Sequence, residues 1–212
     1  MSTRSRKKTE PKSTASSIIE LVAIVVVALL LALGIQAFLI KPYRIPLGSM
    51  IPTLEDGQRV LVNRLNDHLG GPHIGQIVVF HPPKGAGQEV CPSASGERVT
   101  PGGAACSEPA PEHSEENFIK RIVAGPGDVI SIREGHVTRN GKREADSYIR
   151  ACGTSTECNF PTPIKIPAGH WFMMGDNRGE SLDSRFWGPV PTSWIIGDAF
   201  ATYWPPGRIG LL

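Results

Sequence analysis

Residues 21–40 read LVAIVVVALLLALGIQAFLI, an apolar run in which Gln36 is the one strongly polar residue. At about 1.5 Å of rise per helical residue the run is roughly 30 Å long, which matches the hydrocarbon core of a bilayer. We therefore expect a single transmembrane helix over residues 18–40. The competing interpretation is a secretory signal peptide removed after Ala37, but the apolar core of such a peptide is shorter, about 7 to 15 residues. A retained anchor is favoured.

The tail before this run, residues 1–17, is basic. It carries Arg4, Arg6, Lys7, Lys8 and Lys12 against Glu10. Basic residues that flank a first transmembrane helix stay on the cytoplasmic side, so we expect residues 41–212 to form an extracytoplasmic domain. The formal net charge of the whole chain is +2, and much of the positive excess lies in the tail. The external part therefore offers no basic patch, and no nucleic-acid partner is expected.

The part after the apolar run is long enough for one ordinary domain or for two small lobes with a shared core. Short apolar stretches separated by Gly and Pro recur along it, and it shows no convincing long amphipathic helix. We predict a mainly β domain with strands at residues 59–62, 76–80, 118–123, 128–132, 170–174 and 199–204.

Two stretches interrupt this pattern. Residues 83–117 form an insertion rich in Gly, Pro, Ser, Ala and Glu, which contains too few large apolar residues to order itself without help. Residues 141–167 are interpreted as a β-hairpin extension of the domain. The sequence does not indicate what the insertion contacts.

Four cysteines follow the apolar run, at positions 91, 106, 152 and 158. An oxidising compartment would permit disulfides there, and four cysteines allow three pairings. Proximity in the sequence favours Cys91 with Cys106 and Cys152 with Cys158. A zinc site is the alternative, but CxxC spacing and a neighbouring histidine pair are both absent, so no metal is expected.

Ser49, in Gly48-Ser49-Met50, is a candidate nucleophile a few residues after the apolar run. A serine beside a glycine is more often a turn residue, and the esterase pattern G-x-S-x-G is absent here. None of the six histidines has a setting that would pair it with serine and aspartate. If Ser49 is activated, a lysine is the better candidate for its base.

A lysine can act as a base near pH 7 only if its pKa falls by roughly three units, which burial in an apolar site can supply. The chemistry therefore requires a lysine inside an apolar strand. Lys120 meets this requirement, because alternation places it on one face with Phe118 and Ile122. Arg121 shares the other face with Ile119 and Val123, so either basic side chain could be the buried one. An exposed basic pair on an edge strand is the plainer interpretation.

A third segment, residues 175–190, reads GDNRGESLDSRFWGPV. Its polar residues follow an apolar strand and could bond to one another, with Asp183 and Arg185 as an ion pair and Ser181 able to hold a lysine. The alternative is a solvated turn.

Together, three segments resemble the conserved boxes of the bacterial type I signal peptidases. They are Ser49 with the following MIPTL, Lys120-Arg121 with the following GPGD, and the segment from Gly175 to Arg185. The resemblance extends from the apolar helix to about Trp204, with the boxes in the family's order. The insertion at residues 83–117 stands outside the family pattern.

The resemblance implies a membrane-anchored serine endopeptidase with an all-β catalytic domain. Ser49 would be the acylating nucleophile and Lys120 the general base. Ser181 would orient the lysine, Asp183 and Arg185 would hold the loop together, and Arg121 and Asp176 would extend the ionic network. The oxyanion site would be formed at the Ser49 backbone, beside Leu47, Gly48 and Met50.

The implied substrates are the signal peptides of exported preproteins, bound as an added β-strand and cut after small residues. The reaction would take place at the outer surface of the bacterial plasma membrane, beside membrane lipid and the protein-export machinery. No metal or organic cofactor is implied.

Leu47 departs from the family pattern. Many members have a serine at this position whose hydroxyl contributes to the oxyanion hole, and leucine cannot donate a hydrogen bond. Losing one such donor typically lowers the rate by about 10² to 10³. An inactive or weakened homologue that binds signal peptides therefore stays an alternative, as does a membrane-anchored β-rich binding module.

Overall fold

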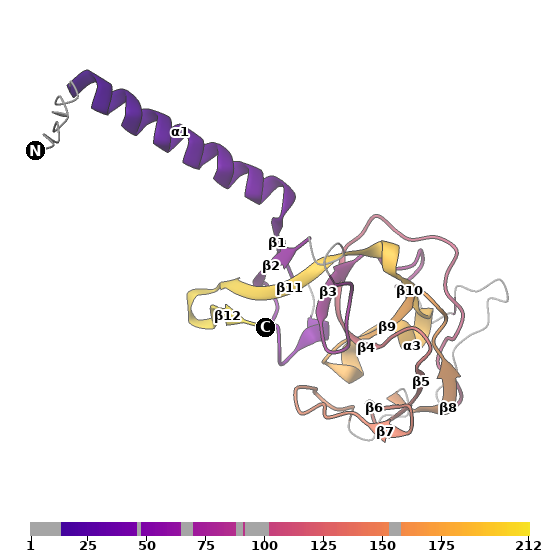
Figure 1. Ribbon diagram of the computed structural model, residues 1–212. Coiled ribbons are helices and arrows are strands. Elements are labelled where there is room, and N and C mark those ends of the chain that lie inside the picture. Colours follow the sequence, from indigo (N-terminus) through magenta and orange to yellow (C-terminus); the bar gives the residue numbers. More distant parts are fainter. Residues whose placement is uncertain (1–13, 46–47, 65–69, 88–90, 92–101, 153–157) are drawn as a thin grey trace, which may run out of the picture. The chain divides into compact units, whose positions relative to one another are not determined.

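The computed structural model describes residues 14–45, 48–64, 70–87, 91, 102–152 and 158–212. The chain divides into two compact units, Met1–Leu39 and Ile40–Leu212. The described part of the first unit is a single helix, α1 (Thr14–Phe38), and Figure 1 shows it in indigo. Its window Ser17–Gly34 has a mean hydropathy of 2.8, so the helix is long and apolar enough to cross a membrane.

Helix α1 ends two residues before the predicted boundary at residue 40. Ile40 instead begins strand β1 (Ile40–Arg44), where it pairs with Asn63 of strand β2 (Arg59–Asn63). The backbone of Ile40 therefore bonds to a neighbouring strand, which a helical conformation would not allow.

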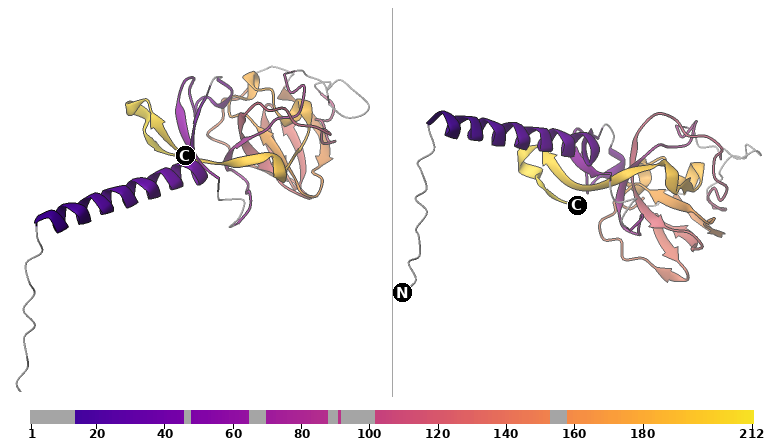
Figure 2. Two further views of the ribbon diagram at one scale, coloured as in Figure 1. Left: turned by 90° about the horizontal axis from the view of Figure 1, so that it is seen from above. Right: turned by 45° about the horizontal axis from the view of Figure 1, so that its top comes forward.

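The second unit is built mainly from β-strands, which confirms the predicted fold class. Its larger sheet has the strand order β1-β2-β11-β3-β4-β9-β10, and β12 pairs with β11. All of these pairings are antiparallel. The strands not yet given bounds are β3 (Ile77–Phe80), β4 (Phe118–Ala124), β9 (His170–Met174), β10 (Val190–Pro191), β11 (Ile195–Trp204) and β12 (Gly210–Leu211). Figure 2 shows β11, in yellow, turning back into β12 at the C-terminal end.

The smaller sheet has the strand order β7-β6-β5-β8. Its strands are β5 (Val129–Arg133), β6 (His136–Arg139), β7 (Lys142–Arg143) and β8 (Phe160–Lys165). Within residues 141–167, β7 pairs with β6 and β8 pairs with β5, rather than with each other. The excursion therefore completes a second sheet.

Short helical turns occupy the connections. The 3₁₀ turns are η1 (Gly48–Met50), η3 (Arg178–Glu180), η4 (Thr192–Trp194) and η5 (Pro206–Arg208), and the short α-helix is α3 (Ser184–Trp187). The described end of the insertion packs onto the domain, because Ala105, Cys106 and Ala110 are buried.

The larger sheet has apolar side chains packed on both faces. Val78 and Phe80 of β3 belong to one core cluster, with Ile122, Phe172 and Trp187. The alternate residues Ile77 and Val79 belong to a second cluster, with Met50, Leu54 and Val62. Because β3 and β4 lie inside this sheet, a polar side chain placed on β4 is removed from water.

Candidate active site

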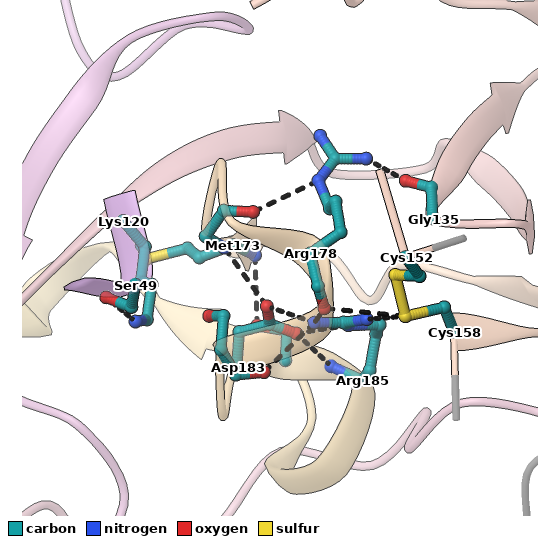
Figure 3. A network of polar contacts seen from close by, with 12 residues as sticks. Ser49, Lys120, Gly135, Cys152, Cys158, Met173, Arg178, Asp183 and Arg185 are labelled. Carbon is teal, nitrogen blue, oxygen red and sulfur yellow. Dashed lines mark hydrogen bonds and ion pairs between the residues drawn. A yellow bond between two sulfur atoms is a disulfide. The ribbon is translucent and has the colours of Figure 1, made fainter. Parts of the chain in front are cut away.

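Ser49 and Lys120 meet in the core of the second unit. Ser49 lies in η1 and is 9% exposed, and Lys120 lies in the middle of β4 and is 4% exposed. Lys120 Nζ and Ser49 Oγ form a hydrogen bond of 2.6 Å (Figure 3). The chain therefore joins the candidate nucleophile and the candidate base directly.

Burial controls the protonation of Lys120. Loss of solvent lowers the pKa of its amine to about 8, while the charge of Asp183 raises it, Arg185 lowers it and Asp176 raises it. The carboxylates of Asp183 and Asp176 are each paired with an arginine, Arg185 and Arg121 respectively. Met173 is fully buried, and Figure 3 shows its side chain extending toward Lys120. The amine thus lies in an apolar setting that favours its neutral form.

The loop after β9 is held by Asp183 and Arg185. Arg185 donates from Nε to Asp183 Oδ1 at 2.7 Å and from Nη2 to Asp183 Oδ2 at 2.8 Å. Its Nη2 also donates to the carbonyls of Ser181 and Arg178, at 3.0 and 2.8 Å. Burial alone would raise the pKa of Asp183, but the charge and hydrogen bonds of Arg185 hold that pKa below its usual value. The pair is therefore ionised, and it fixes the loop backbone.

Arg121 and Asp176 form a second pair. Arg121 donates from Nε and Nη2 to the two oxygens of Asp176, at 2.9 and 2.7 Å. The hydroxyl of Thr53 also donates to Asp176, at 2.5 Å, and the Arg121 guanidinium lies 4.1 Å from the centre of the Tyr148 ring. Lys120 and Arg121 therefore have different roles, one as a buried amine and the other in an ion pair.

Ser181 is buried beside this site, at 5% exposure. Its Oγ has no hydrogen-bond partner among the described residues, so an orienting contact with the lysine stays a prediction. The Ser181 side chain and the Ser49 carbonyl both crowd Gly175, where a Cβ would overlap them. Glycine is therefore required at position 175. Leu47 lies outside the described residues.

Sequence reasoning missed two side chains of the loop, Asn177 and Arg178. Both are buried, at 2% and 1% exposure. Arg178 donates from Nε to the Gly175 carbonyl at 3.0 Å and from Nη1 to the Gly135 carbonyl. Polar residues in a Gly-rich loop usually face water, so only the density of polar side chains after an apolar strand could have pointed to them.

The disulfides are the two pairs that proximity favoured, Cys91–Cys106 and Cys152–Cys158. A cysteine of each disulfide contacts Arg185. Arg185 Nη1 lies 3.6 Å from Cys158 Sγ, and the Cys106 backbone N–H donates to the Arg185 carbonyl at 3.0 Å. The insertion is thus tied to the segment that carries Asp183. Among the described residues, no group of three or more His, Cys, Asp or Glu side chains could hold a metal ion.

A cleft opens beside Ser49 and Lys120. It contains about 560 Å³ of space, part of it open solvent, and apolar side chains from two strands line it together with the end of β1. Its lining residues are Tyr43, Arg44, Ile45, Val79, Asn117, Phe118 and Ile119, besides the two site residues. An extended chain entering this cleft would reach the Ser49 hydroxyl.

Comparisons with known proteins all point to one protein family. Residues 18–204 match the family described as signal peptidase, peptidase S26. A probable signal peptidase I-2 of Synechocystis is 33% identical over 99% of this chain and 83% of its own length. The signal peptidase I of Leptolyngbya laminosa is 34% identical, over 96% of this chain and 87% of its own. Signal peptidase I T of Bacillus subtilis is 30% identical, over 94% and 91%.

Among solved structures, a signal peptidase I from Enterococcus faecalis aligns with 60% of this chain and 95% of its own, at 19% identity and a TM-score of 0.38. The family match spans most of the sequence, including the segments that hold Ser49, Lys120 and the loop after β9. The chain therefore belongs to the signal peptidase family, peptidase S26, and is a peptide-bond hydrolase.

Proposed function

We propose that the protein cleaves signal peptides from exported preproteins with a catalytic dyad of Ser49 and Lys120. The observation that carries this proposal is the 2.6 Å contact between the Ser49 hydroxyl and an amine whose pKa burial lowers to about 8. At pH 7 about one molecule in ten then holds a neutral lysine, against a few in ten thousand for a free side chain. Such a neutral amine can accept the hydroxyl proton.

The reaction then follows in two steps. Ser49 Oγ attacks the scissile carbonyl while its proton moves to Lys120 Nζ, and the tetrahedral intermediate collapses to an acyl-enzyme. The leaving amine takes the proton from Lys120 and departs. Lys120, again neutral, removes a proton from water, which attacks the ester carbonyl. The proton then passes from Lys120 to Ser49 Oγ as the ester bond breaks, which releases the second product and restores both side chains. The Ser49 N–H would stabilise the oxyanion.

The substrate class is inferred from the cleft and from the relatives. The cleft lies between the end of β1 and the start of β4, where backbone groups could pair with an extended peptide as an added strand. Curated relatives are named signal peptidase I. We expect cleavage after small residues, with the signal-peptide segment in this cleft.

The cellular setting is part of the same proposal. Helix α1 would anchor the protein in the plasma membrane, with the basic tail in the cytoplasm and the second unit outside. Membrane lipid and the export machinery would then be its neighbours. The mean hydropathy of 2.8 over Ser17–Gly34, which includes one charged residue, Glu20, supports the anchor.

Two variants test the dyad, both made in the full chain in detergent. Ser49→Ala removes the nucleophile and Lys120→Met removes the base while keeping an apolar stem, so each should abolish cleavage of a preprotein. Lys142→Met is the matched control, because Lys142 is exposed on β7 and should keep full activity. Circular dichroism checks folding. Cleavage retained in the Lys120 variant would end the dyad assignment, and an intact wild type that binds but never cleaves would favour the binding-only homologue.

A further inference from the structure

Asn177 is a buried side chain that holds the backbone on both sides of the candidate nucleophile. Its Nδ2 donates to the Gly48 carbonyl at 3.0 Å, and its backbone N–H donates to the Ser49 carbonyl at 3.0 Å. It is 2% exposed. The Gly48 carbonyl belongs to the same peptide group as the Ser49 N–H. One residue of the loop after β9 therefore fixes the peptide planes before and after Ser49.

The orientation of the Asn177 amide is determined by its partners. Nδ2 also donates to Glu180 Oε2 at 2.8 Å. The Glu180 backbone N–H donates in turn to the backbone carbonyl of Asn177 at 3.0 Å. A backbone carbonyl and an ionised carboxylate both only accept hydrogen bonds, so the nitrogen of the amide must face them. Both amide hydrogens are then used. The carboxylate strengthens the amide as a donor to the Gly48 carbonyl.

The Gly48–Ser49 peptide is a rigid plane, so fixing its carbonyl also fixes the direction of its N–H. The Gly48 carbonyl also accepts from the Ile51 N–H at 3.2 Å, which occupies its second lone pair. A peptide whose carbonyl accepts hydrogen bonds is polarised, and its N–H becomes a stronger donor. The Ser49 N–H lies in the peptide plane that these bonds hold.

We infer that Asn177 is a positioning residue that aims and strengthens the Ser49 N–H as the oxyanion donor. The inference rests on the proposed Ser49 acylation. It matters more in this chain because position 47 holds leucine, whose side chain offers no second donor. Asn177 acts through its hydrogen bonds to the Gly48 and Ser49 carbonyls.

This role differs from holding the loop in place. The Asp183–Arg185 pair and the Arg121–Asp176 pair anchor the loop through other atoms. Removing the Asn177 amide leaves both pairs intact, so the setting of Lys120 should persist. The effect should then appear in the chemical step while substrate binding and the lysine pKa stay unchanged.

The test compares Asn177→Ala and Asn177→Asp with the wild type, as full chains in detergent, on one preprotein-derived peptide. The aspartate keeps the shape and the backbone bond to Ser49 but presents an acceptor to the Gly48 carbonyl. We expect kcat to fall about 10- to 100-fold in the alanine variant and at least as far in the aspartate variant, with KM within about threefold. In the alanine variant, which adds no charge, the acidic limb of the pH profile should stay near pH 8.

A peptide aldehyde of the same sequence gives an independent measurement, because it forms a tetrahedral adduct with a serine hydroxyl. Its affinity should fall in parallel with kcat in both variants. Asn159→Ala is the matched control, since the Asn159 side chain accepts from the Glu134 N–H at 2.7 Å beside the smaller sheet. It should leave kcat and aldehyde affinity unchanged.

Two results would overturn the positioning role. One is a kcat within twofold of the wild type in both variants. The other is a shift of the acidic limb in the alanine variant together with the loss of kcat, which would indicate a disturbed Lys120 instead. If Asn177→Ala does not fold, the aspartate variant decides alone. Failure of the proposed function is recognised separately, because either the wild type would then not cleave the peptide or Ser49→Ala would still cleave it.

Discussion

Two carboxylate–arginine pairs act on Lys120, and they differ in their access to water. In the pair of Asp183 and Arg185 the side chains are 0% and 1% exposed, and the arginine also binds two loop carbonyls. In the pair of Asp176 and Arg121 the carboxylate is equally buried, but the arginine is 12% exposed and lies over a tyrosine ring. The first pair is enclosed in the core, and the second reaches the surface.

The difference shows how the chain lowers the pKa of one amine that lies among charged groups. Asp183 and Asp176 both raise the pKa of Lys120, and each is already paired with an arginine. Arg185 opposes the effect of Asp183 on the pKa of Lys120. Burial is the larger cause and lowers the pKa overall. The enclosed pair therefore holds the loop backbone, and both of its charges affect the pKa of Lys120. The outer pair mainly holds the loop.

Breaking the pair of Asp183 and Arg185 should lower the free energy of unfolding more than any other change proposed here. Arg185→Met leaves Asp183 as an unpaired charge in the core, which typically costs about 3 to 5 kcal/mol in the free energy of unfolding. Urea denaturation of the full chain in detergent measures this loss. Lys84→Met is the control, because the Lys84–Glu112 pair is exposed and should contribute nothing measurable. A loss below about 1 kcal/mol for Arg185→Met would show that the enclosed pair does not support the loop.

The pH dependence of cleavage should show the next largest effect. The active form holds neutral Lys120, so kcat/KM should fall tenfold per unit below about pH 8, and about a hundredfold from the plateau to pH 6. Asp183→Asn removes the charge that raises the pKa of Lys120 most, so the acidic limb of this variant should move to lower pH. A limb near pH 10, or one that does not move in the variant, would contradict the description of Lys120 as a buried amine.

The strands that the sequence located are those whose apolar residues recur in short uninterrupted runs, as in β3 and β9. Strands β1, β6, β10 and β12 lie outside the predicted strands, and β8 was predicted only as part of the hairpin extension at residues 141–167. Strands β1 and β8 contain proline: Pro42 lies in β1, and Pro161 and Pro163 lie in β8. Proline cannot donate to a ladder, so its presence argues against a central strand. Both strands lie at the edge of their sheets, where proline is tolerated. The sequence carries no signal that distinguishes an edge position beforehand.

The sequence also could not choose between Lys120 and Arg121, because each shares a face with two apolar residues. Alternation fails along β4 itself, where an irregular register between Ile122 and Ala124 leaves three consecutive residues buried. What encloses Lys120 comes from distant segments, Ser49 in η1 and Met173 in β9. Such long-range packing is absent from a local pattern, and the same reason explains why Asn177 was missed.

The outer pair should show the smallest effect when only its geometry is changed. Arg121→Lys keeps the positive charge but replaces a two-pronged contact with Asp176 by a single one, and it removes the flat guanidinium from the Tyr148 ring. Because water reaches this arginine, we expect a loss of about 1 to 2 kcal/mol in the free energy of unfolding, measured in the same urea experiment. The charge that Lys120 experiences is unchanged, so the acidic limb should remain near pH 8. A loss equal to that of Arg185→Met would mean that the two pairs are equivalent, and exposure would then not be what separates them.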